Sequence, residues 1–193
     1  MKLIDITRTS QDAPIYEGDA EMTVVKVCDM SKGAPYNSSV ISAGSHIGTH
    51  ADAFSHFIKD GLSIDKMPLD LFYGTAEVVS FKAGIIKLSD VKDKIENTER
   101  LIVQGKGKAF LSKDAARYLV SKKIKLVATD ALSVAPAYNQ EREIHTVLLN
   151  AGIAVIENII LDGVKQGRYT LIAFPIKIKG CDGAPVRAAL IKE

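Results

Sequence analysis

The chain has 193 residues, of which 47% are hydrophobic and 25% charged, a balance typical of a folded globular protein rather than a disordered or membrane-embedded one. Its 25 basic and 23 acidic residues give a formal net charge of +2 and form no strong block of either sign, so neither a nucleic-acid surface nor another polyanion-binding surface is indicated.

The two cysteines, Cys28 and Cys181, lie far apart in the sequence and belong to no CxxC pattern. This spacing argues against a disulfide framework and a cysteine-rich zinc site, and it favours a reducing, cytoplasmic compartment. No apolar stretch has the length of a membrane span or a signal peptide, so we expect neither a membrane anchor nor export. No repeat or flexible linker interrupts the chain, which predicts one domain over residues 1–193.

Short runs rich in β-branched and apolar residues recur along the chain and predict strands. They lie at residues 3–7, 22–27, 39–44, 76–81, 101–104, 125–130, 153–158 and 169–178. Between the later runs, apolar residues repeat at three and four and predict helices. These cover residues 112–123, about 142–150 and 89–95.

The predicted helices carry recognisable end signals. Ser112 is a plausible N-cap of the first, and Gly152 follows the end of the second. The early strands follow one another through turns, whereas the later ones alternate with helices. We therefore expect antiparallel pairing first and parallel connections afterwards, in a mixed α/β fold.

Three of the four histidines fall in the stretch HIGTHADAFSHF at residues 46–57. Imidazole nitrogen and carboxylate oxygen are common ligands of zinc and similar ions, and His46, His50 and Asp52 supply three of them. If the strand that begins near Ser39 continues through this stretch, these side chains face one side of the sheet. Positions four apart on an ideal strand are separated by roughly 13 Å, so we expect a bend or bulge at Gly48.

A water bound to such an ion has a pKa of about 7, and the ion also polarises a carbonyl group, which makes hydrolysis the natural reaction. A nearby unligated histidine can relay protons to a leaving group, and His56 is the candidate for this role. The stretch lacks the HExxH glutamate, which disfavours a zincin-type protease. A lone histidine is more often an ordinary buried or surface residue, but the spacing of these side chains favours a metal site.

The stretch resembles the HxGTHxDxPxH signature of the metal-dependent cyclase family, whose members include kynurenine formamidases and isatin hydrolases. The later segment EIHTVLLNAGIAVIEN resembles the second ligand segment of that family, with His145 and Glu157 twelve positions apart. Further similar segments lie at residues 16–19, 67–74, 128–133 and 174–188, so the resemblance covers nearly the full length.

The resemblance implies a three-layer β/β/α domain of the swivelling type, often assembled as a homodimer. It implies that His46, His50 and Asp52 bind a first ion, and that Asp52 bridges to a second ion bound by His145 and Glu157. The ions would be zinc or manganese, one or two in each subunit. His56 would be the general acid/base.

Taken alone, the later pair has ordinary explanations. His145 could simply pack on its helix, and Glu157 could be a solvated carboxylate at a strand end. Phe54 replaces the proline of the signature and is either a pocket residue that contacts substrate or an ordinary core aromatic. Tyr16 is a second candidate for substrate contact, because its segment lies near the pocket in the family. The loop at 180–185 is also expected near the active site.

The residues predict a metal-dependent hydrolase, and the resemblance implies that it acts on a small amide or formamide, with kynurenine formamidase (arylformamidase) activity as the leading assignment. Hydrolysis of a lactam or lactone, as in isatin hydrolase, is the first alternative. A non-catalytic protein that binds a metal or a small ligand is the second. The substrate is expected to be a small molecule, with no nucleic acid or membrane partner.

Overall fold

The computed structural model describes residues 2–95, 98–136 and 140–192. Within them, one sheet is formed by β1 (Lys2–Asp5), β4 (His50–Asp52), β5 (Tyr73–Ser80), β7 (Arg100–Gln104), β9 (Leu126–Thr129), β10 (Ala154–Glu157), β11 (Gly167–Ile172), β12 (Gly183–Pro185) and β13 (Ala189–Lys192). Its nine strands lie in the order β1-β13-β11-β5-β7-β9-β10-β4-β12. Two further pairs are β2 (Thr23–Cys28) with β3 (Ser38–Ser42), and β6 (Gly84–Ile86) with β8 (Ala109–Leu111).

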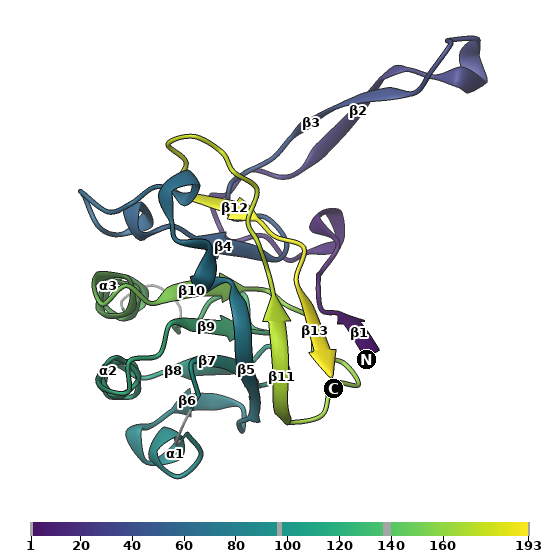
Figure 1. Cartoon of the computed structure of the whole chain (residues 1–193). Coiled ribbons are helices and arrows are strands. Elements are labelled where there is room, and N and C mark those ends of the chain that lie inside the picture. Colours follow the sequence, from purple (N-terminus) through teal and green to yellow (C-terminus); the bar gives the residue numbers. More distant parts are fainter. Residues whose placement is uncertain (1, 96–97, 137–139, 193) are drawn as a thin grey trace.

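The helices are α1 (Leu88–Lys92), α2 (Lys113–Ser121) and α3 (Glu141–Asn150), and they lie along one side of the sheet (Figure 1). Short 3-10 turns occupy Ser10–Asp12, Met30–Lys32, Phe54–His56, Ile64–Lys66 and Leu69–Leu71. In the part of the chain that is described, none of the helices has the length and apolar character required to cross a bilayer.

Local sequence accounts for the helix ends. The Ser112 hydroxyl accepts a hydrogen bond from the amide of Ala115 at 3.2 Å, as expected of an N-cap. The helix α3 ends at Asn150, and Gly152 follows with a φ of +74°, a left-handed conformation that glycine adopts easily. The predicted positions of α2 and α3 are thus confirmed, and α1 covers the first part of the predicted 89–95 helix.

The strands β5, β7, β9 and β10 run parallel to one another, and α3 connects β9 to β10. All residues of β9 and β10 are buried, which explains why these strands are continuous apolar runs. The pair β2–β3, which comes first, is antiparallel. The predicted mixed α/β class is confirmed, while the three-layer swivelling arrangement stays a prediction.

Two predicted strands are longer in the sequence pattern than in the structure. The run from Ser39 does not continue to Asp52, because β3 ends at Ser42 and β4 begins only at His50. The run 169–178 stops at Ile172, and within its remainder Pro175 makes only an isolated bridge to Val186. Proline has no amide hydrogen to donate to a ladder, which limits pairing at this point.

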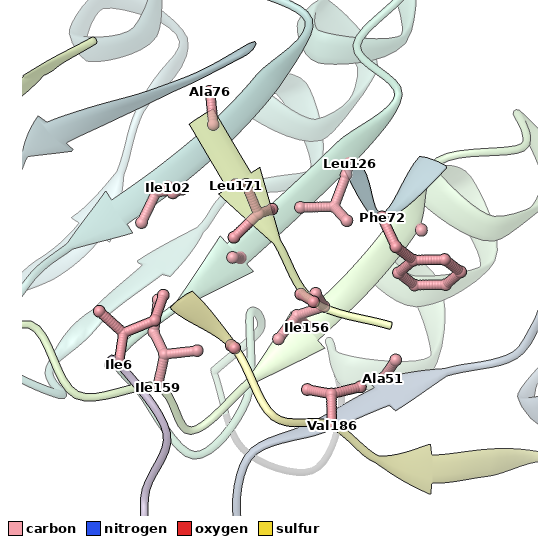
Figure 2. Close-up of a cluster of buried hydrophobic side chains, with 14 of the residues drawn as sticks. Ile6, Ala51, Phe72, Ala76, Ile102, Leu126, Ile156, Ile159, Leu171 and Val186 are labelled. Carbon is pink, nitrogen blue, oxygen red and sulfur yellow. The ribbon is translucent and has the colours of Figure 1, made fainter. Parts of the chain in front are cut away.

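Buried apolar side chains form two cores. The first is built from strands and loops, and Figure 2 shows Phe72, Ile156 and Leu171 among its members. The second contains the buried faces of the helices, with Leu119 of α2 and Leu148 of α3. Burial of each such side chain contributes roughly 1.5–3 kcal/mol, so the two cores hold both surfaces of the sheet in place.

Arg100 of β7 is buried and ties the chain around residues 70–75 to the sheet. Its Nε donates to the carbonyl of Leu71 at 2.8 Å, and its Nη2 donates to the carbonyl of Asp70. Gly74 has a φ of +131°, and a Cβ there would lie 2.8 Å from Nη1 of Arg100. Glycine at this position therefore makes room for the guanidinium group.

Candidate metal centre

The centre is built around β4, which pairs antiparallel with β10 on one side and with β12 on the other. Alternate residues of a strand face the same side, so His50 and Asp52 share a face of β4. Both are buried, and His50 Nε2 lies 3.5 Å from Asp52 Oδ1. The shared face predicted for these two residues is confirmed.

His46 lies in the turn before β4 rather than on a strand, and Gly48 bends the chain between His46 and β4. Gly48 has a φ of +62°, and a Cβ there would lie 2.8 Å from Oγ of Ser10. The bend brings His46 Nδ1 to 3.1 Å from Asp52 Oδ1. The predicted bend at Gly48 is confirmed, whereas the predicted continuous strand is wrong.

The second stretch reaches the same point from α3 and β10. Glu157 lies directly opposite His50 in the β4–β10 pair, and His145 projects from α3. His145 Nε2 lies 3.1 Å from Glu157 Oε1 and 3.5 Å from Asp52 Oδ2. Both residues are buried, so Glu157 is not a solvated strand-end carboxylate.

Backbone carbonyl groups determine which ring nitrogens face the cluster. His50 Nδ1 lies 3.0 Å from the carbonyl of Gly48, and His145 Nδ1 lies 2.9 Å from the carbonyl of Glu141. A carbonyl only accepts, so each Nδ1 donates and, in a neutral ring, each Nε2 is left with a lone pair. These lone pairs face carboxylates, an arrangement that requires a proton or a cation between them.

The donor set fits a metal ion. Asp52 Oδ2 is buried and has no hydrogen-bond partner among the described residues. Around Asp52, two triads place their ligand atoms within 4.8 Å of one another: His46 with His56, and His50 with Glu157. A buried carboxylate oxygen that accepts no hydrogen bond is costly unless a cation neutralises it. These residues therefore suit an ion bound by nitrogen and oxygen.

Without an ion, the carboxylates hold protons on the rings. Burial alone would lower the pKa of His46, but its hydrogen bond to Asp52 and the charges of Asp52 and Asp182 raise that pKa to about 9. The pKa of His145 is also raised well above its usual value against burial, by Asp52 and Glu157. A bound cation would replace these protons.

His56 differs from the other rings. Burial lowers its pKa, and the nearby charges of His46 and His145 lower it further, against the effect of Asp52. Its ring lies over that of His46, with the centroids 4.0 Å apart. A neutral imidazole at the edge of the cluster can accept a proton.

Asp182 joins the site from the loop before β12, and sequence reasoning did not single it out. Its Oδ2 lies 3.3 Å from His46 Nε2 and 3.7 Å from His56 Nδ1, and its Oδ1 accepts a hydrogen bond from the hydroxyl of Ser45. The only signal in the sequence was that loop 180–185 belongs to a segment similar to the family. Asp182 is placed to orient both rings.

A cavity of about 170 Å³ is lined by histidines of the cluster and Glu157, together with Tyr16, Phe57, Leu132 and Glu141. The hydroxyl of Tyr16 donates to Oε2 of Glu141 at 2.6 Å, so this pair spans from the early loop to α3. Sequence reasoning also missed Glu141 and Phe57. Ordinary ligand pockets measure about 300–1,000 Å³, so this one suits a compact molecule.

Phe54 does not line this cavity; it is partly buried and packs against both hydrophobic cores. Its surroundings favour the core alternative that the sequence left open. The phenylalanine that lines the cavity is Phe57. The centroid of its ring lies 4.3 Å from that of His56 and 4.9 Å from that of His145.

Known proteins are similar to this chain over most of its length. The Cyclase family model matches residues 4–136. The kynurenine formamidase of Delftia acidovorans is 33% identical over 202 residues, which cover 98% of this chain and 97% of that enzyme. The kynurenine formamidase of Bacillus thuringiensis is 32% identical over 97% of this chain and 96% of its own length.

Solved structures share the fold. A potential metal-dependent hydrolase with cyclase activity superposes with a TM-score of 0.87 at 27% identity, over 100% of this chain and 98% of its own. Isatin hydrolase A from Labrenzia aggregata also gives a TM-score of 0.87, at 22% identity. The match covers 100% of this chain and 94% of the hydrolase.

Proposed function

Because the chain belongs to the cyclase family, we propose that it is a metal-dependent hydrolase that cleaves a carbon–nitrogen bond in a small amide or formamide. Kynurenine formamidase (arylformamidase) activity is the leading assignment, since enzymes of that name align with nearly the whole chain. The observation that carries the proposal is the convergence of histidines from two distant stretches on the buried carboxylate of Asp52. His46 and His50 approach its Oδ1, and His145 approaches its Oδ2.

In this proposal His46, His50 and Asp52 would hold one ion, and Asp52, His145 and Glu157 would hold a second where two are bound. His56, whose ring nitrogen also lies within 4.8 Å of donor atoms of His46 and Asp52, stays unligated. Zinc and manganese both suit imidazole and carboxylate ligands. A divalent ion at this place would polarise the substrate carbonyl and lower the pKa of a water to about 7. The fixed Nδ1–H donors of His50 and His145 would keep each Nε2 available for binding.

His56 is the general acid/base. Its lowered pKa leaves the ring neutral near pH 7, so it can accept the proton of the attacking water. The same proton then passes to the departing nitrogen, which leaves as an amine. Asp182, 3.7 Å from His56 Nδ1, orients the ring for both transfers and disfavours its rotation away from the cavity.

Tyr16 is a substrate contact in this proposal, because it lines the cavity and is held by Glu141. The small cavity also suits a compact cyclic substrate, which keeps lactam or lactone hydrolysis as the second candidate. The protein is proposed to act as a homodimer in the cytoplasm, where its two free cysteines stay reduced.

The test combines metal analysis with a substrate panel. Protein purified without a chelator or a histidine tag should contain zinc or manganese, and it should hydrolyse an aryl formamide in a panel that also holds lactams, lactones and esters. The His56→Ala variant should keep its metal and lose about 10²–10⁴-fold in rate. A metal-loaded protein that turns over no member of the panel would instead be a binding protein.

A further inference from the structure

A second cavity, the strand-end cavity, lies at the carboxyl ends of three parallel strands. β5, β7 and β9 are neighbours in the sheet (Figure 1). The cavity measures about 620 Å³ and is lined by Ser80 and Gln104, the last residues of β5 and β7, and by Asp130, which follows β9. Ligands of α/β sheets commonly bind outside the carboxyl ends of the strands, in cavities of about 300–1,000 Å³. Position and size therefore suit a small molecule.

The strand-end cavity is separate from the candidate metal centre. Among the described residues, none that lines this cavity also lines the smaller cavity beside the histidines. The loop after β9 contributes to both, because Asp130 lines the strand-end cavity and Leu132 lines the other. A molecule in the strand-end cavity would therefore leave the proposed metal ligands free.

Hydrogen bonds within the protein hold Gln104 at the inner side of this cavity. Its Nε2 donates to the carbonyls of Leu161 and Val164 at 3.2 and 2.8 Å, and its Oε1 accepts from the hydroxyl of Ser80 at 2.6 Å. These bonds tie the ends of β5 and β7 to the loop after β10. The inner wall is therefore preorganised, so a ligand would not have to order it.

Asp130 holds the turn after β7 against the cavity. Its buried carboxylate accepts hydrogen bonds from the amide of Gly105 at 3.0 Å and from that of Lys106 at 2.8 Å. Lys106 has a φ of +54°, a left-handed conformation that is strained for a residue with a Cβ. Strained residues of this kind persist where their surroundings enforce them, and they cluster at binding sites. The turn thus keeps a lysine at the cavity where glycine would be less strained.

Three lysines line the opening of the strand-end cavity. Lys82, Lys106 and Lys108 are exposed, and none of them takes part in an ion pair among the described residues. The acidic residues of the lining are Asp162, which is exposed, and Asp130, whose carboxylate faces the backbone amides of the turn. Positive charge is therefore in excess where a ligand would enter.

Apolar side chains lie beside these lysines. Phe81, Ala83 and Leu161 also line the cavity. The lining thus combines apolar surface with a few charged groups, which is the usual composition of a small-molecule site. Because the chain has no strong basic block elsewhere, the three lysines suit one small anion better than a nucleic acid.

We propose that the strand-end cavity binds a small organic anion, with one carboxylate or phosphate group on a compact apolar body. Lys82, Lys106 and Lys108 bind the anionic group, because each ammonium group is a flexible donor that suits either type of oxygen. Phe81 and Leu161 contact the apolar body. This binding does not depend on the proposed hydrolysis, since the two cavities have no lining residue in common among the described residues.

A titration followed by nuclear magnetic resonance locates the binding. The isotope-labelled protein, supplied with zinc, is titrated with benzoate, with phenyl phosphate, and with benzamide, which has nearly the shape of benzoate but no charge. We expect the anions to shift the backbone amide signals of Ala83, Gly105 and Lys106, and benzamide to bind at least ~10-fold more weakly than benzoate. The ratio of the affinities for benzoate and phenyl phosphate then distinguishes a carboxylate site from a phosphate site.

A pair of double variants tests the lysines. Lys82→Glu with Lys108→Glu replaces two attractive charges at the cavity by repulsive ones and leaves the strained Lys106 in place. Lys2→Glu with Lys123→Glu, at exposed lysines outside the cavity, changes the net charge equally and is the matched control. We expect at least ~10-fold weaker binding of benzoate and phenyl phosphate by the first variant, and wild-type binding by the control. Circular dichroism confirms that both are folded.

Three results would overturn the anion site. Signals that shift only near the metal centre, at residues such as Phe57 and Leu132, would mean that the anions bind there instead. Benzamide that binds as tightly as benzoate would show that charge is not recognised. An equal loss in the control would indicate an effect of net charge rather than of these lysines. Hydrolysis is measured separately, so its absence would contradict the proposed function and leave the titration result unchanged.

Discussion

His50 and Glu157 lie directly opposite each other in the antiparallel pair β4–β10, and their side chains approach to 3.6 Å. The backbone register of the sheet thus joins one ligand candidate from each of the two sequence stretches. Because a shift of register by one residue would turn every side chain to the other face, the same hydrogen bonds that hold β4 also determine the geometry of the centre.

Glu157→Gln should weaken metal binding. The substitution keeps the shape of the side chain but removes the charge that faces His50 and His145. We expect at least a ~10-fold loss of affinity, measured by competition with a chelating dye. Glu143→Gln, at an exposed glutamate on α3, is the control and should bind like the wild type. Unchanged affinity in Glu157→Gln would contradict the ligand assignment.

Asp182→Asn should lower activity without removing the metal. It takes away the charge that faces His56 Nδ1, so the ring is held less well and kcat should fall by about 10–100-fold. Asp182 also raises the pKa of His56, so the acidic limb of the kcat/KM profile should move to lower pH. The exposed Asp60→Asn variant is the control; a profile identical to that of the wild type would count against a positioning role.

Gly48→Ala should disrupt both stability and the centre. A left-handed φ costs a non-glycine residue roughly 1–2 kcal/mol, and here the new Cβ would also meet Ser10 at 2.8–2.9 Å. Gly163 has a similar φ of +73° and nothing within 4 Å, so Gly163→Ala isolates the cost of strain. Urea denaturation should show a larger loss for Gly48→Ala, accompanied by weaker metal binding. Equal losses would indicate that the bend tolerates a methyl group.

Metal-free protein should lose stability as pH rises from about 6.5 to about 9. The pKa of His46 is raised from 6.5 to about 9 in the folded state, so its protonated form stabilises folding fully below 6.5 and this contribution is lost through 9. Asp52 and Glu157 have lowered pKa values, so their contribution is lost on the acidic side. Thermal unfolding after chelator treatment checks this. Added metal should protect more at pH 8.5 than at pH 6, because protons compete less there.

Arg100→Ala should destabilise the fold by about 2–6 kcal/mol, because it leaves the carbonyls of Asp70 and Leu71 unpaired, and each buried acceptor without a partner costs about 1–3 kcal/mol. Arg168→Ala, at an exposed arginine of β11, should stay within about 0.5 kcal/mol of the wild type. Denaturant titration distinguishes the two; a small effect at Arg100 would mean that water replaces its hydrogen bonds.

The sequence predicted most of the regular elements because their signals are local. Ser112 marks a helix start through one hydrogen bond, and β9 and β10 are continuous apolar runs. The short strands β6, β8, β12 and β13 escaped prediction, because three or four residues hold too little pattern to distinguish a strand from a loop. Their pairing is decided by neighbours that are distant in sequence.

The site residues also divide into those that local sequence signals predict and those whose position depends on distant parts of the chain. Spacing and residue type were enough to single out His46, His50 and Asp52, which the structure brings together. Resemblance to a family was needed for His145 and Glu157, because their proximity depends on α3 packing against the sheet. Asp182 could not be chosen from the sequence, since its loop approaches His56 only through the pairing of β12 with β4.

The strand order also determines how the chain can assemble. β1 pairs with β13, and β4 lies between β10 and β12, so β1 and β4 have no partners until much later segments are available. Each pairing this distant in sequence must close a large loop of chain before it gains contacts. The entropy lost in closing that loop slows folding toward the millisecond-to-second range. A chain cut just before β12 would carry all of the proposed ligands and still lack one of the two strands that hold β4.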